Sequence, residues 1–244
     1  MRARCSPEWE ASMPMTQGFA IRVDRLKAEL IQQTRRVHAL LEACFESVFA
    51  RDPAKAARAM AMDDEVDRAD VEIEKASVQL LTDATHENAK MEPGELRSVL
   101  TVVKVNNELE RVADAGVAMA ERVAVLRDMP GQIPETFRVM TNSVLGIMRD
   151  TGTSYERLDA VLAKVVLQSE DCVEAFKEAI LRDAERKIAQ GTMPVDFALS
   201  LHELANECCK IADHCTNIAE QVIYLATGAI VRHTDAGWVE VKSA

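Results

Sequence analysis

Four pairs of side chains that could bind a metal ion recur along this chain of 244 residues. The two members of each pair are four residues apart, so on a helix they lie one above the other with Cβ atoms about 6 Å apart. Carboxylate oxygens are the ligands that hard cations such as Mg²⁺, Mn²⁺, iron or Ca²⁺ prefer. The candidate metal ligands are Asp63 and Asp67, Glu110 and Asp114, Glu170 and Glu174, and Cys209 and Asp213.

The same pairs are also compatible with ordinary solvated helix faces. Charged residues make up 28% of the chain, so acid pairs at this spacing arise by chance. Like charges four apart destabilise an isolated helix by about 0.2–0.5 kcal/mol, a sign that a shared cation would reverse. Recurrence in both halves of the chain favours the metal interpretation. Four nearby residues could add ligands or orient them, or could be solvated or locally hydrogen-bonded: Asp70, Glu74, Asn107 and Asn206.

An internal repeat puts these pairs at matching positions in the two halves of the chain. From Leu201 to Leu225 apolar residues recur at intervals of three and four, which predicts a helix with one buried stripe. The equivalent positions 99 residues earlier are also apolar, except that Gly116 indicates a close approach of another helix. Asp159 occupies the place of Asp52, 107 residues earlier, and each can cap a helix. The chain is therefore interpreted as a duplication.

The composition favours long helices. Aromatic residues make up only 4% of the chain, and 9 Gly and 7 Pro leave few turns. We therefore expect an all-α fold of two tandem three-helix bundles, at 16–128 and 134–228, joined by a linker at 129–133. A disordered N-terminal tail (1–15) and a C-terminal tail (229–244) are expected to flank them. In the first bundle the expected helices cover 16–51, 53–85 and 93–127, and Gly228 is expected to end the last helix.

Charge and motif content exclude several classes of function. With 29 basic against 40 acidic residues, the net charge of −11 disfavours nucleic-acid binding. No run of 18 uncharged apolar residues predicts insertion into a membrane. The six cysteines show no disulfide framework, which is typical of a reduced cytoplasmic protein. No phosphate-binding glycine loop, nucleophile elbow or Glu-x-x-His element appears, so an enzyme is not expected, although a metal-dependent hydrolase or oxidase stays an alternative.

Three segments resemble the signatures of one family. Residues 107–114 (NELERVAD) look like the "ELERIGD" signature of the PhoU family, the bacterial phosphate-uptake regulators. Residues 211–220 (IADHCTNIAE), followed by Gly228 and Arg232-His233, resemble the second signature of the family and its ending. Residues 63–67 (DDEVD) are similar to its acidic motif in helix two. The likeness covers residues 16–233.

The resemblance implies a function as well as a fold. Family members have two three-helix bundles related by a pseudo-twofold axis, and E/D-x-x-x-D motifs that bind divalent or trivalent metal ions, iron above all, with Zn, Mn or Mg as alternatives. The resemblance implies a non-enzymatic negative regulator that couples a phosphate ABC transporter, through its ATPase subunit, to a phosphate-sensing histidine kinase. It also implies a cytoplasmic homodimer held at the inner membrane by its partners. An accessory of a different phosphate or ion transporter is the alternative.

The sequence departs from the family at one candidate ligand. Where the second signature should read Glu-Arg, this chain has Cys209-Lys210. A cysteine is a softer ligand than a carboxylate and is usually protonated near neutral pH. The second site is therefore expected to be weakened, lost or changed in its metal preference, while the first site looks intact.

Overall fold

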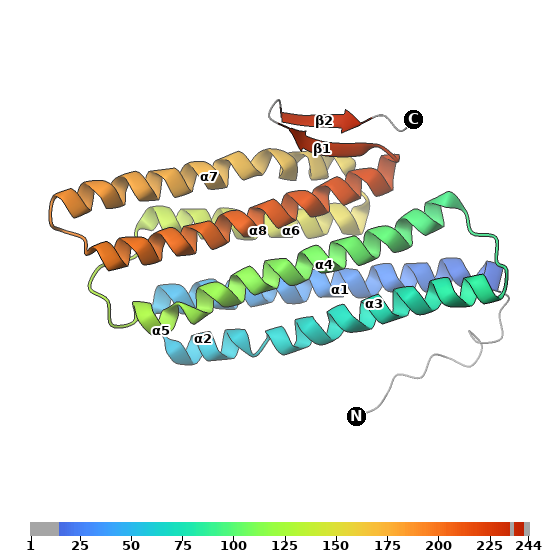
Figure 1. Cartoon of the computed structure of the whole chain (residues 1–244), viewed down its shortest axis with the longest axis horizontal. Helices are drawn as coiled ribbons and strands as arrows, with labels where there is room; N and C mark the ends of the chain where they lie inside the picture. The colour runs from blue at the N-terminus through green and yellow to red at the C-terminus, as the bar shows by residue number, and fades with distance from the viewer. Residues whose placement is uncertain (1–14, 235–236, 242–244) are drawn as a thin grey trace.

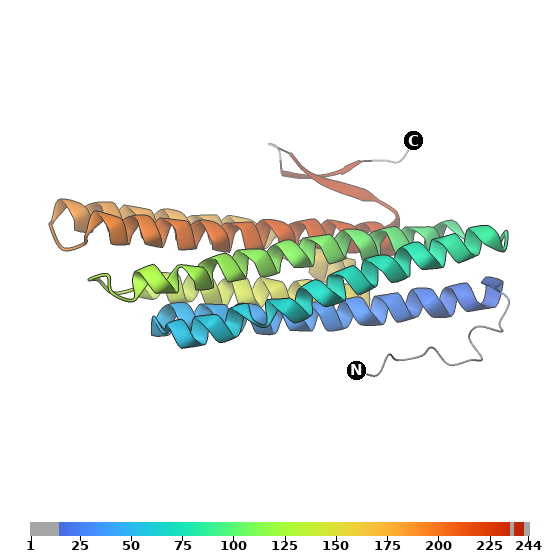
Figure 2. The ribbon, with the colours of Figure 1, turned by 60° about the horizontal axis from the view of Figure 1, so that its bottom comes forward.

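The computed structural model in Figures 1 and 2 is an elongated bundle whose long helices run side by side. The structure describes residues 15–234 and 237–241. Helices account for nearly all of this part of the chain, which confirms the all-α prediction. The predicted N-terminal tail lies outside the described residues, apart from Met15, the first residue of the first helix.

Eight helices form within the described residues, and none of them is long and apolar enough to cross a membrane. The first half of the chain contains α1 (Met15–Ala50), α2 (Pro53–Met60), α3 (Asp63–His86), α4 (Pro93–Glu121) and α5 (Val123–Leu126). The second half contains α6 (Glu135–Arg157), α7 (Ala160–Ala189) and α8 (Val195–Thr227).

Matching turns begin α2 and α7, as the repeat predicts. Asp52 caps α2 and Asp159 caps α7, and each carboxylate accepts hydrogen bonds from two backbone N–H groups of the first helical turn. The residues just before them, Arg51 and Leu158, both adopt the left-handed conformation, with φ of 49° and 51°. The duplication therefore extends to the backbone of the turn that separates the helices.

Two helices expected to be continuous are broken in the first half, so those expectations were wrong. The segment 53–85 divides at Ala61 and Met62 into α2 and α3, and the segment 93–127 divides at Arg122 into α4 and α5. The equivalent α7 and α8 are unbroken. The first break makes Asp63 the first residue of α3, so this candidate ligand lies in the first turn, where the free N–H groups of a helix favour a carboxylate.

The helices pack with the symmetry expected of a duplicated chain. In the first half α1, α3 and α4 contact one another, and in the second half α6, α7 and α8 do the same. Between the halves α4 packs on α8, its equivalent, and α1 packs on α6, its equivalent. Exchanging the halves leaves this pattern unchanged, as a pseudo-twofold relation requires. In Figure 1, α4 and α8 run together through the middle of the molecule.

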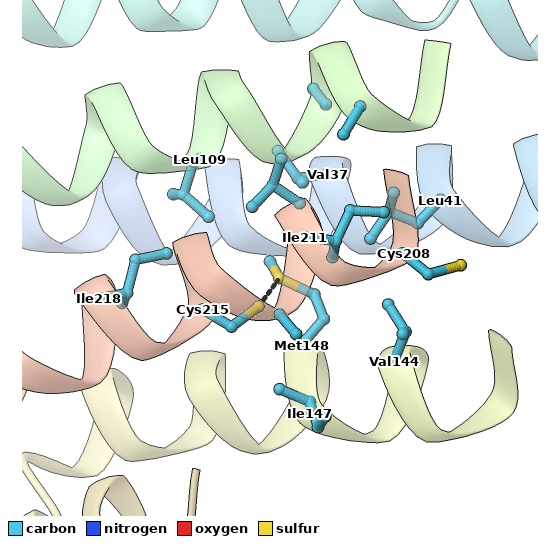
Figure 3. Packing of buried hydrophobic residues seen from close by; sticks show 14 of the residues in the cluster. Val37, Leu41, Leu109, Val144, Ile147, Met148, Cys208, Ile211, Cys215 and Ile218 are labelled. Atoms are coloured by element: carbon cyan, nitrogen blue, oxygen red, sulfur yellow. Dashed lines mark hydrogen bonds between the residues drawn. The ribbon is translucent and has the colours of Figure 1, made fainter. Parts of the chain in front are cut away.

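One continuous hydrophobic core joins the two halves. Figure 3 shows Val37, Leu109, Met148 and Ile211, from α1, α4, α6 and α8, meeting in its centre, all fully buried. Nearby, the Cys215 thiol donates a hydrogen bond to the Met148 sulfur at 3.8 Å. The apolar stripe predicted on α8 is buried from residue 201 to residue 222. The two predicted bundles therefore share their interior.

The C-terminal tail expected at 229–244 contains a pair of strands. Strands β1 (Ile230–Thr234) and β2 (Gly237–Val241) pair antiparallel after Gly228, which ends α8 at a φ of 77° as predicted. Arg232 forms an ion pair with Glu220 of α8, which ties β1 to the bundle. The β-branched residues in these strands were the available signal for a hairpin. They are Ile230, Val231, Thr234, Val239 and Val241.

Candidate metal centre

The first candidate site lies where α3 packs on α4. Burial, followed by the charges of Asp67 and Asp114, raises the pKa of Asp63 from its ordinary value of 3.8 to about 6. Burial, followed by the charge of Asp114, also raises the pKa of Glu110. The interaction of Asp63 with Asp114 links α3 to α4. The other two interactions, Asp63 with Asp67 and Glu110 with Asp114, lie within one pair. The two pairs of the first half therefore face each other across the contact between α3 and α4, close enough for their charges to interact, and we call these four residues the carboxylate cluster.

Asp70 extends this cluster along α3 and is held by a buried amide. The side-chain amide of Asn106 donates hydrogen bonds to the backbone oxygen of Asp70 at 3.0 Å and to its carboxylate at 2.7 Å. Burial and the neighbouring charge of Glu74 raise the pKa of Asp70. Sequence reasoning named Asn107, which is exposed, rather than its neighbour. The available signal was the place of Asn106 next to the apolar stripe of α4.

The second candidate site, between α7 and α8, has a different organisation. The Cys209 thiol donates a hydrogen bond to Oε2 of Glu174 at 3.3 Å, and the ammonium of Lys177 lies 2.6 Å from Oε1 of the same carboxylate. The hydrogen bond from Lys177 lowers the pKa of Glu174. Sequence reasoning did not name Lys177, although its place three residues after Glu174 puts both on one helix face.

The remaining candidates of the second half lie close by. Burial raises the pKa of Asp213, whose carboxyl group also shares a hydrogen bond with Glu170. Asn206 contacts the ring of His202, one turn earlier on α8, at 3.2 Å. The structure thus gathers Glu170, Glu174, Cys209 and Asp213 around the line where α7 meets α8, while Asn206 is engaged within its own helix.

A polar bridge that sequence reasoning missed connects the two halves. Nδ1 of His214 on α8 lies 2.8 Å from a carboxylate oxygen of Glu108 on α4, and the amide of Asn217 donates to the same oxygen at 3.1 Å. Burial raises the pKa of Glu108, but the hydrogen bonds from His214 and Asn217 outweigh it, and the pKa is lowered overall. Residues so far apart in sequence give no local signal of such a contact.

The donor set of the first site fits a hard cation. Asp63, Asp67, Glu110 and Asp114 offer carboxylate oxygens, and a bound cation would relieve the mutual repulsion that adds to burial in raising the pKa of Asp63 and Glu110. Among residues 15–234 and 237–241, no three His, Cys, Asp or Glu side chains are already gathered around one point. Binding would therefore require these carboxylates to turn toward the ion.

The donor set of the second site does not fit the same ion. Both oxygens of Glu174 are engaged, one by Lys177 and one by Cys209. Burial, followed by the hydrogen bond to Glu174, raises the pKa of the Cys209 thiol to about 12. Since the thiolate rather than the thiol is the metal ligand, this cysteine is a poor substitute for a carboxylate at neutral pH.

A cavity between two other helices lies apart from both acidic clusters. It has a volume of about 260 Å³ and lies between α1 and α6, where its lining includes Thr34, Arg35, His38 and Arg149. None of the candidate ligands lines it. The carboxylate clusters are therefore features of helix faces and do not share this cavity.

Replacing Asp63 by asparagine is expected to stabilise the metal-free protein above pH 6. Because its pKa rises from 3.8 to about 6 on folding, the folded state binds the proton more tightly, and the free energy of unfolding falls as pH rises between those values. Solvent screening at this partly exposed carboxyl limits the gain to about 1 kcal/mol. Urea unfolding at pH 5 and pH 8 with a chelator measures it. Glu72→Gln, an exposed position of the same helix, is the control. An unchanged pH dependence in Asp63→Asn would contradict the prediction.

A family model for the PhoU domain matches residues 30–123 and 137–222 of this chain. The chain is 25% identical over 207 residues to "Phosphate-specific transport system accessory protein PhoU homolog 1" of Thermotoga maritima, covering 83% of this chain and 86% of the relative. It is 26% identical over 212 residues to the PhoU homolog of Aquifex aeolicus, covering 86% of this chain and 94% of that relative.

Two solved structures have a similar fold. The phosphate transport system regulatory protein PhoU from Streptococcus pneumoniae superimposes with a TM-score of 0.79 at 18% identity, covering 88% of this chain and 99% of that one. PhoU from Pseudomonas aeruginosa superimposes with a TM-score of 0.77 at 22% identity, covering 86% and 99%. At these identities the two structures support the fold alone.

Proposed function

This chain belongs to the PhoU family, and from that premise we propose that it is an accessory protein of a phosphate transport system. Its relatives in Thermotoga maritima and Aquifex aeolicus are named as such accessory proteins, and the similarity extends over most of their length. In finer terms, we propose a negative regulator of phosphate uptake and of phosphate-starvation signalling. It would couple the ATPase subunit of a phosphate ABC transporter to a phosphate-sensing histidine kinase.

The observation that carries the mechanism is the carboxylate cluster between α3 and α4. Asp63, Asp67, Glu110 and Asp114 would hold a divalent or trivalent metal ion, iron first, with Mn, Zn or Mg as alternatives. A bound ion would supply positive charge and so neutralise part of this face. The packing of α3 on α4 holds these carboxylates on one face. The charge of that face would therefore depend on metal occupancy.

The proposed regulator acts by binding and not by catalysis. The candidate ligands lie on helix faces, and the cavity between α1 and α6 contains none of them. The net charge of −11 suits protein partners better than nucleic acid or an anionic lipid surface. We propose that the chain works as a cytoplasmic homodimer that reaches the inner membrane only through the transporter and the kinase.

Deleting the gene tests the proposal. In phosphate-rich medium the deletion strain is expected to express phosphate-starvation genes constitutively, and a plasmid copy of the wild-type gene is expected to restore silence. A reporter fused to a starvation promoter measures both. Continued silence in the deletion strain would contradict the regulatory role. Co-purification of the tagged protein with the transporter ATPase and with the kinase tests the two partners separately.

A further inference from the structure

We infer that the second half of this chain carries its own cation, the ammonium of Lys177, in place of a metal ion, so that hard metal ions bind to the first half alone. This inference deepens the metal-binding part of the proposed function and rests on it. It also gives the two acidic faces different roles: one responds to metal, and the other is permanently neutralised in part.

The duplication allows the two clusters to be compared residue by residue. Positions 63, 67 and 70 of α3 correspond to positions 170, 174 and 177 of α7, with a constant offset of 107. Positions 110 and 114 of α4 correspond to 209 and 213 of α8, with a constant offset of 99. Three of the five positions keep a carboxylate in both halves. The other two exchange Asp70 for Lys177 and Glu110 for Cys209.

These two exchanges change the charge of the cluster. The five positions of the first half carry five carboxylates, a formal charge of −5. The same positions of the second half carry three carboxylates, one ammonium and one neutral thiol, a formal charge of −2. Because the affinity of an oxygen site for a hard cation depends on the number of charged ligands, the second half has lost most of the attraction that the first half offers.

In the second half, both carboxylate oxygens of Glu174 are engaged by other side chains. Lys177 lies 2.6 Å from one oxygen of Glu174, with its side chain only 20% exposed, and Cys209 donates to the other oxygen at 3.3 Å. A metal ion would have to displace both groups to reach this carboxylate. In the first half the position equivalent to Lys177 is Asp70, which adds a carboxylate instead of an ammonium. The amide of Asn106 holds this carboxylate in place.

Restoring the residues of the first half to the second half tests the inference. The double variant Lys177→Asp with Cys209→Glu is expected to bind additional Mn²⁺ per chain, with an affinity in the second half raised by about tenfold or more. Mn²⁺ titration followed by calorimetry, and elemental analysis after dialysis, measure both quantities. The matched control is Lys164→Asp with Cys172→Glu, which makes the same substitutions at exposed positions of α7. It is expected to bind as the wild type does.

A second experiment tests whether the additional Mn²⁺ binds to the second half of the chain. It uses a chain that lacks the first site. In a chain whose first site is removed by Glu110→Ala with Asp114→Ala, high-affinity Mn²⁺ binding is expected to be lost and to reappear on adding Lys177→Asp with Cys209→Glu. Tight Mn²⁺ binding by the second half before that addition would overturn the inference, and so would a folded exchange variant that gains no Mn²⁺.

A reciprocal exchange covers the case in which the restored variant does not fold. Asp70→Lys with Glu110→Cys gives the first half the residues of the second, and it is expected to lose the Mn²⁺ binding of the wild type. Wild-type affinity in this folded variant would overturn the inference. Failure of the proposed function appears instead as unchanged reporter silence in the deletion strain, which does not depend on metal counts.

Discussion

The double variant Glu110→Ala with Asp114→Ala is expected to lose high-affinity metal binding while its helical content stays unchanged. These residues supply the α4 side of the carboxylate cluster, so their removal leaves only the α3 carboxylates to face the ion. We expect a fall in Mn²⁺ affinity of about 100-fold or more, because even residues that merely orient ligands change affinity by about 10–100-fold. Glu110 is half-buried and Asp114 is exposed, so truncation opens no cavity in the core.

Elemental analysis and calorimetric Mn²⁺ titration measure the loss, and far-ultraviolet circular dichroism checks the helices. The control is Glu72→Ala with Glu121→Ala, which removes the same charge at exposed positions of α3 and α4. Metal binding equal to that of the wild type in the double variant at 110 and 114 would remove the first site from the proposed function. In the reporter strain the same variant is expected to fail to restore silence.

Gly116→Val is expected to cause the largest loss of stability. A Cβ atom at Gly116 would lie 2.8 Å from Cδ2 of Leu41 and 3.0 Å from Cδ2 of Leu40, and both leucines are fully buried. Valine adds two further methyl groups, so the side chains of Leu40 and Leu41 would have to shift within a filled core. Overpacking of this kind costs about 3 kcal/mol.

Denaturant unfolding followed by circular dichroism measures the effect of Gly116→Val. Gly94→Val is the matched control on the same helix, because a Cβ atom at Gly94 meets nothing within 4 Å. The control is expected to keep its stability or to gain a few tenths of a kcal/mol, because valine has a higher helix propensity than glycine. Equal stability of the two variants would show that α1 and α4 do not approach as closely at Gly116 as the structure indicates.

Local patterns were sufficient to predict most of the fold. The apolar stripe of α8 and the caps at Asp52 and Asp159 depend on residues a few positions apart, and the structure confirms them. The breaks at Met62 and Arg122 could not be predicted, because neither Gly nor Pro marks them. They depend on how neighbouring helices pack, which spacing along one helix does not contain.

In the candidate site too, local spacing could be predicted from the sequence and contacts between helices could not. Spacing of four residues placed Asp63 with Asp67 on one face, because helix geometry fixes that relation. It could not identify the groups that approach from another helix or engage the pair. Asn106 reaches Asp70 from α4, and Lys177 neutralises Glu174, through contacts that depend on side-chain direction and helix packing.

A single three-helix unit would leave in water the apolar stripe that α4 and α8 bury against each other. Two separate copies could bury it only as a symmetric homodimer, in which every substitution appears in both subunits. Fusion of two gene copies removes that restriction, because each copy can then mutate alone. Lys177 and Cys209 could arise in one copy while Asp70 and Glu110 persisted in the other. Covalent duplication thus permits the two acidic faces of one chain to carry different residues.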